Sequence, residues 1–233
     1  MRVVFVHGAC VRDGAWWWHP TAELLREHGV VSAAPALPSC GEAGRPPGGE
    51  DGPGFAEDVA AVRRVLLAGD EPTVVVAHSY GGMVTAEAAA GVPTVRHLLL
   101  VSSYLPEVGQ SLADFGDGDG PAPFLTVDPA VGTFAVRPDL LAGTFLQDCT
   151  TDQQAGAAER LAAQSLAVIG HPVAVAAWQQ LPSTYLVCGA DRGTSPERQR
   201  AYARRAGRVV ELDAGHHPFL SRPGEVRDLV LTL

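Results

Sequence analysis

Thr73-Val74-Val75-Val76-Ala77-His78-Ser79-Tyr80-Gly81-Gly82-Met83 is the stretch that decides the fold. Its first five residues are apolar enough to form a buried strand, and the small residues of 83–91 predict a helix. Ser79 therefore falls at a sharp strand-to-helix turn, where Ala77 and Gly81 allow strand and helix to approach closely. Such a turn presents a serine hydroxyl as a nucleophile. The alternative is that Ser79 only caps the following helix.

Short Val- and Leu-rich runs of strand length recur along the chain, at residues 3–6, 30–34, 73–77, 98–101, 184–188 and 209–212. Helix-like stretches lie between most of them, at 20–28, 55–68, 83–91, 196–206 and 223–231. This alternation predicts an α/β fold with a mostly parallel sheet, each strand buried on both faces, and helices on both sides. At 233 residues and 46% hydrophobic content, the chain is expected to form one domain.

Two segments interrupt the alternation of strands and helices. Residues 35–54 are rich in Pro and Gly and predict an irregular loop. Residues 106–182 lack convincing strands and contain helix-like stretches at 140–147 and 152–167, which predicts a helical cap inserted into the domain. Ligands bind at the carboxyl edge of open α/β sheets, so a cap there would shape the pocket. The short run 116–120 predicts a flexible turn.

A serine nucleophile needs an imidazole to take its proton and a carboxylate to orient that imidazole. After a turn of this kind the partners follow in the order Ser, Asp or Glu, His. Asp191 and His216 each follow a predicted strand, so both are expected at the sheet edge that carries Ser79. The preceding strand ends in Ser102-Ser103-Tyr104, without a carboxylate. The alternative for Asp191 is a solvated loop residue or a helix cap.

Other candidates for these roles fit less well. Asp213 lies too close in sequence to His216 to orient it. His217 would point away from its neighbour and is expected in the pocket wall or on the surface. His78 is expected to pack beneath the turn, and His7 to brace its own loop by hydrogen bonding.

The composition excludes several classes of function. A net charge of -9 disfavours nucleic acid as a partner. All 17 basic residues are Arg, so no lysine Schiff base can form. The four cysteines lack metal-ligand spacing, which argues against zinc and against a dense disulfide framework. No signal peptide or membrane-spanning run is evident, so a cytoplasmic protein with no cofactor, no metal and no membrane partner is expected.

A small-residue loop, His7-Gly8-Ala9-Cys10, follows the first predicted strand. A loop at this position can turn a backbone amide towards the carbonyl oxygen of a substrate. We assign that role to the amide of Ala9, together with the amide of Tyr80, which lies at the N-terminus of the helix after the turn.

The sequence resembles the α/β-hydrolases that include plant methylesterases, hydroxynitrile lyases and related bacterial esterases. The resemblance covers nearly the whole chain and is carried by Val6-His7-Gly8-Ala9-Cys10 with Gly14-Ala15-Trp16, residues 77–83, Tyr104-Leu105-Pro106 with Gly109-Gln110-Ser111-Leu112, Leu181-Pro182-Ser183-Thr184-Tyr185, and residues 215–223. It implies the α/β-hydrolase fold, Ser79, Asp191 and His216 as a triad, and Ala9 and Tyr80 as oxyanion donors.

The resemblance also separates esterase from lyase. The lyases of this family have a Thr where this chain has Gly8, and a Lys where it has His217. We therefore expect a serine hydrolase that cleaves small carboxylic esters through an acyl-enzyme, as a monomer or homodimer. The Ala-rich, all-Arg composition hints at a bacterial source. Two alternatives remain: a biosynthetic cyclase, eliminase or transesterase on the same scaffold, and a non-catalytic small-molecule-binding protein.

Overall fold

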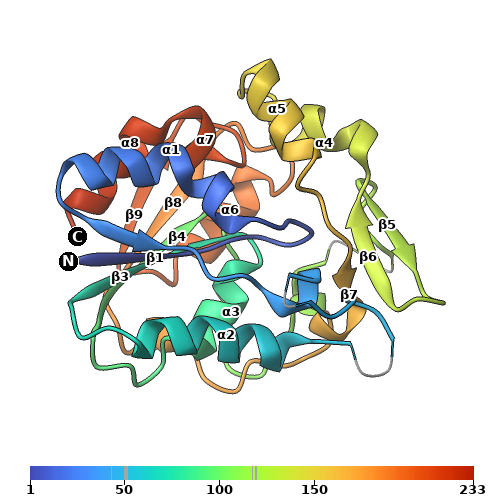
Figure 1. The fold of residues 1–233 in the computed structure, drawn as a ribbon, viewed down its shortest axis with the longest axis horizontal. Coiled ribbons are helices and arrows are strands. Elements are labelled where there is room, and N and C mark those ends of the chain that lie inside the picture. Colours follow the sequence, from blue (N-terminus) through green and yellow to red (C-terminus); the bar gives the residue numbers. More distant parts are fainter. Residues whose placement is uncertain (43, 50–51, 117, 119) are drawn as a thin grey trace.

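The apolar run after Pro72 forms β3 (Thr73–His78), whose six residues are all buried. It lies between β1 and β4 at the centre of a six-stranded sheet with the order β2-β1-β3-β4-β8-β9, in which every neighbouring pair is parallel (Figure 1). The computed structural model describes residues 1–42, 44–49, 52–116, 118 and 120–233. Residues 43, 50 and 51 of the predicted loop, and 117 and 119 of the predicted turn, lie outside the described residues.

The predicted α/β architecture is confirmed. The other strands of the sheet are β1 (Arg2–Val6), β2 (Val31–Ala33), β4 (Val95–Val101), β8 (Ser183–Cys188) and β9 (Arg208–Leu212). The helices that cover it are α1 (Gly14–Glu27), α2 (Phe55–Leu67), α3 (Gly81–Ala88), α6 (Pro196–Ala203), α7 (Pro218–Ser221) and α8 (Pro223–Leu231). Within the described residues, no helix combines the length and apolar character that a bilayer span requires.

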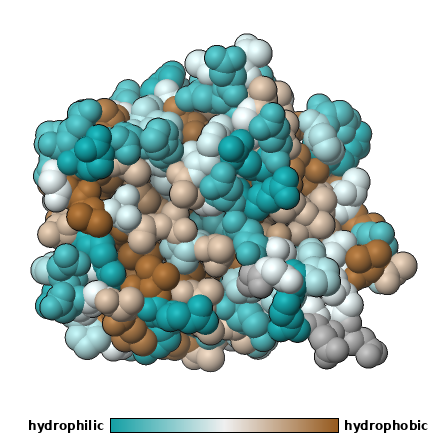
Figure 2. All heavy atoms as spheres, viewed as in Figure 1, coloured by the Kyte–Doolittle hydropathy of each residue, from teal (hydrophilic) through white to brown (hydrophobic). Residues whose placement is uncertain are grey.

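Two hydrophobic layers hold the helices against the sheet. One face packs Trp17, Trp18 and Val226 from α1 and α8, and the other packs Val62 and Val84 from α2 and α3. Figure 1 shows α1, α7 and α8 on one side of the sheet and α2 and α3 on the other. On the face of the molecule that Figure 2 shows, hydrophilic residues are interspersed with smaller groups of hydrophobic residues.

The expectation that every strand is buried on both faces is wrong for the two edges. Val31 of β2 is 65% exposed and Val209 of β9 is 52% exposed. Both strands have a neighbour on one side only, so helices cover them less completely than the central strands.

The segment between β4 and β8 is only partly helical, which corrects the prediction of a helical cap. It contains α4 (Pro138–Phe145) and α5 (Thr151–Ala158), and also an antiparallel sheet of β5 (Leu125–Asp128), β6 (Thr133–Val136) and β7 (Gln164–Ser165). The predicted helix 152–167 was too long: after α5, Leu161 bridges to Val11 and the chain turns into β7. These elements lie beyond the carboxyl ends of the main strands (Figure 1).

Candidate active site

Ser79 occupies the tight turn between β3 and α3. Its φ of 51° is in the left-handed region, which a non-glycine residue adopts only under strain. The turn brings α3 against β1 so closely that a Cβ atom on Gly81 would lie 2.5 Å from the carbonyl oxygen of Val6. Only glycine fits there, and the predicted strand–turn–helix context of Ser79 is confirmed.

The backbone of the turn is tied to the end of β4. The carbonyl oxygen of Ser79 accepts hydrogen bonds from the amides of Gly82 and Tyr104, each at 3.1 Å, and from the Ser103 hydroxyl at 2.9 Å. A Cβ atom on Gly82 would lie 2.1 Å from the carbonyl oxygen of Tyr104. These contacts fix the position from which the Ser79 hydroxyl is presented.

Asp191 and His216 form a buried pair at the same edge of the sheet. His216 Nδ1 lies 2.6 Å from Asp191 Oδ2. Asp191 Oδ1 accepts the amides of Gly193 at 2.7 Å and Thr194 at 3.0 Å. Burial alone raises the pKa of Asp191, but the charge and hydrogen bond of His216, with smaller contributions from hydrogen-bond donors, outweigh burial and lower it. The carboxylate is therefore ionised at neutral pH and holds the imidazole in one orientation.

Ser102 contacts both members of this pair. It was not predicted as a site residue. Its hydroxyl lies 2.5 Å from Asp191 Oδ2 and 3.1 Å from His216 Nδ1, and its own φ is 41°. The Gln199 amide donates to the same carboxylate oxygen at 2.8 Å. The sequence showed only that no carboxylate ends β4; a serine there carries no signal of its own.

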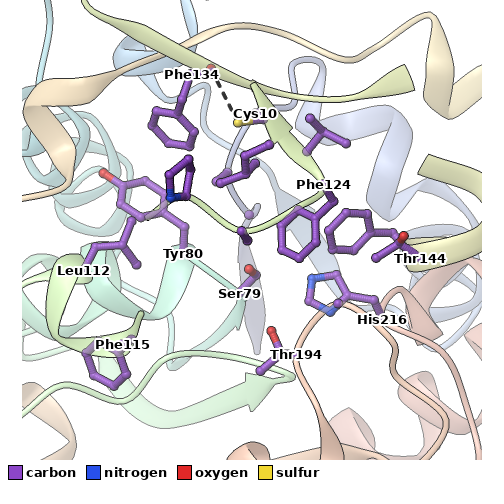
Figure 3. Close-up of a pocket in the computed structure, with 18 of the residues that line it drawn as sticks. Cys10, Ser79, Tyr80, Leu112, Phe115, Phe124, Phe134, Thr144, Thr194 and His216 are labelled. Carbon is purple, nitrogen blue, oxygen red and sulfur yellow. Dashed lines mark hydrogen bonds between the residues drawn. The ribbon is translucent and has the colours of Figure 1, made fainter. Parts of the chain in front are cut away.

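Ser79 and His216 face the same cavity from different elements. Figure 3 shows both side chains directed into one space, with Thr194 beside them. The structure shows no hydrogen bond between the Ser79 hydroxyl and His216. Catalytic hydrogen bonds often tighten only when a substrate binds, so this geometry is compatible with the predicted pairing.

The two predicted oxyanion donors also border the cavity. Both Ala9 and Tyr80 line it. Within the described residues, neither backbone amide has a hydrogen-bond acceptor, whereas the next amide, that of Cys10, donates to Gln164 Oε1 at 2.9 Å. Two amides without an acceptor beside Ser79 can bind a negatively charged oxygen.

A buried polar network joins the two oxyanion segments from behind. The Tyr80 hydroxyl donates to Asp58 Oδ2 at 2.8 Å, and Asp58 also accepts the amide and hydroxyl of Ser39 at 2.9 and 2.5 Å. Gln164 donates to the Ser39 hydroxyl at 2.9 Å while it accepts from Cys10. Burial raises the pKa of Asp58, although these donors partly offset it. No sequence pattern indicates this network, because its members come from five separate segments.

His7 braces its loop, as predicted. Its Nε2 lies 3.1 Å from Glu42 Oε2, and its Nδ1 lies 2.8 Å from the carbonyl oxygen of Gly8. Glu42 also accepts the amides of Asp13 and Leu37 at 2.6 and 3.2 Å. One carboxylate therefore connects the loop after β1 to the loop after β2.

His78 lies beneath the turn, also as predicted. Its Nε2 is 3.0 Å from the carbonyl oxygen of His216. Burial, followed by the nearby charges of His216 and His217, holds the pKa of His78 well below its ordinary value. His217 is a buried residue of the cavity wall, which excludes the surface alternative.

The turn between α4 and α5 holds the two loops that carry Asp191 and His216. Gln147 donates to the carbonyl oxygen of Ala190 at 2.7 Å. Asp148 accepts the amide of Gly215 at 2.7 Å and the hydroxyl of Ser221 at 2.7 Å. Ala190 and Gly215 directly precede Asp191 and His216, so this turn positions the two loops relative to each other.

The cavity above Ser79 has a volume of about 1320 Å³. Its wall is largely apolar and includes Leu112, Phe115, Phe124, Phe134, Leu141 and Phe145, several of which are labelled in Figure 3. Such a wall favours an uncharged, largely apolar ligand.

All four cysteines are free, and three of them are buried.

Comparisons with known proteins show which family the chain is similar to. A model of the family described as "Alpha/beta hydrolase family" matches residues 3–229. The "Probable hydrolase R7" of Phoma sp. is 29% identical over 190 residues, which cover 76% of this chain and 77% of the relative. "Methylesterase 9" of Arabidopsis thaliana is 25% identical, with 99% of this chain and 96% of the relative covered.

Solved structures show the same fold. The pyrethroid hydrolase from Sphingobium faniae JZ-2 superposes with a TM-score of 0.84 at 20% identity, covering 100% of this chain and 96% of that one. At this level of identity the superposition establishes the fold, including the parallel sheet and its covering helices.

Proposed function

Because the chain belongs to the alpha/beta hydrolase family, we propose that it hydrolyses carboxylic esters, with Ser79 as nucleophile, His216 as base and Asp191 as the residue that orients the base. One observation carries the proposal: a strained serine, a buried His–Asp pair at 2.6 Å and two amides without acceptors in the described residues meet at one cavity. A relative named as a methylesterase supports the same reaction class.

The reaction would proceed by acyl transfer. His216 takes the proton of the Ser79 hydroxyl as its oxygen attacks the ester carbonyl, and returns that proton to the departing alcohol. Water, activated by the same imidazole, then cleaves the acyl-enzyme and releases the acid. Asp191 stabilises the imidazolium that forms in both steps.

The amides of Ala9 and Tyr80 would bind the oxygen that becomes negative in each tetrahedral intermediate. Both amides belong to segments held from behind by buried hydrogen bonds, those of Gln164 and Asp58. A preorganised donor pair of this kind costs no rearrangement during the reaction. This rigidity supports the assignment of the two amides.

The cavity favours bulkier substrates than the small esters expected from the sequence. Its volume of about 1320 Å³ exceeds what a short-chain ester fills, and its wall is mostly apolar. We therefore propose neutral esters with an aromatic or other sizeable apolar group as substrates.

Labelling with a fluorophosphonate probe, combined with ester turnover, tests the proposal. The wild-type protein should be labelled and should hydrolyse aryl and methyl esters with a burst of alcohol release. Ser79→Ala should abolish labelling and lower kcat by roughly 10⁴-fold or more. Ser183→Ala, which removes a buried hydroxyl at the opposite end of the sheet, is the matched control and should keep both.

The outcomes separate the alternatives. Full activity in Ser79→Ala would overturn the assignment of the nucleophile. A wild-type protein that is not labelled would indicate a binding protein. Labelling of Ser79 without turnover of any simple ester would indicate a biosynthetic enzyme on the same scaffold.

A further inference from the structure

His217 is a cavity residue that the proposed reaction does not use. Its Nδ1 lies 3.1 Å from the carbonyl oxygen of Phe145. A carbonyl oxygen can only accept a hydrogen bond, so Nδ1 must carry a proton. If the ring is neutral, Nε2 then carries a lone pair and no proton, so it can only accept a hydrogen bond.

The surroundings keep this ring neutral. His217 is 6% exposed and packs against aromatic rings, with its centroid 5.0 Å from that of Trp17 and 5.3 Å from that of Phe219. Burial, followed by the nearby charge of His216, lowers the pKa of His217 to about 3. The lone pair on Nε2 therefore persists at neutral pH.

Nε2 is accessible from the cavity. It has no hydrogen-bond partner within the described residues, and it is not among their fully buried side-chain atoms that lack one. Since His217 lines the cavity, a substrate bound there would meet this accessible edge. The ring centroids of His217 and His216 are 5.0 Å apart, so this acceptor lies close to the proposed base.

An acceptor in this position discriminates between ligands. Around it the wall is aromatic, with Trp17 and Phe145 beside the ring. An apolar group placed against Nε2 strips it of water without replacing the hydrogen bond, which is unfavourable. A ligand hydroxyl would restore that bond. A site built around a polar group therefore rejects analogues that lack the partner.

We propose that His217 Nε2 accepts a hydrogen bond from a substrate hydroxyl close to the reacting carbonyl, so that the preferred substrates are hydroxy esters. The inference rests on the proposed ester hydrolysis, because it assigns the substrate class of the same cavity. It makes His217 a specificity-determining residue, separate from the proton transfers assigned to His216.

Three pairs of esters that differ in one hydroxyl test the inference. They are methyl mandelate and methyl phenylacetate, methyl 3-hydroxy-3-phenylpropanoate and methyl 3-phenylpropanoate, and 2-hydroxyethyl and ethyl phenylacetate. For each pair, the ratio of kcat/KM is divided by the ratio of the hydroxide-catalysed rates, which removes differences in intrinsic reactivity. Wild-type protein should favour the hydroxy ester of at least one pair by about tenfold.

Two variants attribute that preference to His217. His217→Met introduces a side chain of similar length that lacks the Nε2 acceptor. It should reduce the preference to about onefold. His217→Gln keeps an acceptor oxygen and should retain part of the preference. Probe labelling of Ser79 in both variants controls for an intact site.

The inference fails if wild-type protein shows no hydroxyl preference in any pair, or if His217→Met keeps the preference unchanged. If the methionine variant does not fold, the wild-type arm can still overturn the inference, and His217→Gln tests the attribution to His217. Absence of all ester turnover and of probe labelling would instead refute the proposed function, so the two failures are distinguishable.

Discussion

Ser79 and Ser102 lie at the carboxyl ends of the adjacent strands β3 and β4, and both have positive φ values, 51° and 41°. Only four non-glycine residues in the described part of the chain have a positive φ. Such strain persists where the surrounding structure enforces it, and it often marks functional positions. Here one strained serine faces the cavity and the other bonds to Asp191.

Replacing Ser102 tests whether its hydroxyl positions the pair. Ser102→Ala should lower kcat by about tenfold to a hundredfold with little change in KM, because a hydrogen bond to a charged carboxylate is lost. Ser102→Gly removes the same hydroxyl but relieves the positive φ, so it should lose as much activity while unfolding at a higher temperature than Ser102→Ala. Steady-state kinetics and thermal denaturation measure both effects.

Ser183→Ala serves again as the control, because it deletes a buried serine hydroxyl far from the site and should leave kcat unchanged. Wild-type kcat in both Ser102 variants would show that the hydroxyl contributes packing only.

At the residue scale, the sequence predicted the members of the site that follow a rule of position. Ser79 directly follows β3, Asp191 and His216 lie in the loops after β8 and β9, and the structure brings all three to one edge. Gln164 and Asp58 could not be predicted in this way, because their partners, Cys10 and Tyr80, lie far away in sequence. Such contacts become visible only once the chain has folded.

At the scale of elements, the strands and helices of the main sheet were predictable because apolar runs of strand length alternate with helical patterns. The strands β5, β6 and β7 were not, since they have only four, four and two residues. Runs this short carry little periodicity, and pairing between them, not local preference, makes them strands.

The close packing of β1 and α3 gives a prediction at this scale. Gly81→Ala should destabilise the protein by roughly 1–3 kcal/mol or more, because its Cβ would meet the backbone of Val6 and the neighbouring residue. The matched control is Gly143→Ala in the exposed part of α4, where a Cβ would meet nothing within 4 Å. It should stabilise by about 0.5–1 kcal/mol.

Urea denaturation of the two variants measures the difference. Equal stabilities would mean that β1 and α3 can separate without cost, contrary to the described packing.

At the scale of the whole molecule, the buried histidines make stability depend on pH. His217 binds a proton in the unfolded chain near pH 6.5 but only near pH 3 when folded. Between these values the unfolded state holds more protons, so stability falls as the pH falls. For this residue the loss should be about 2 kcal/mol between pH 7 and pH 5.

His217→Met should therefore flatten the dependence of the unfolding free energy on pH by about that amount over the same range. Ser183→Ala, which changes a buried side chain that does not titrate, should keep the wild-type slope. Denaturation curves at several pH values test this, and identical slopes for wild type and His217→Met would count against a buried neutral ring.

The turn of Gln147 and Asp148 has a consequence for protein engineering. Because it bonds to the residues just before Asp191 and His216, we expect the cap and the two loops that carry this pair to behave as one module in chimeras. Chimeras with relatives should therefore take their crossover points outside this module, before residue 106 and after residue 221. A cap exchanged alone would arrive without the matched loops and would misalign the pair beneath it.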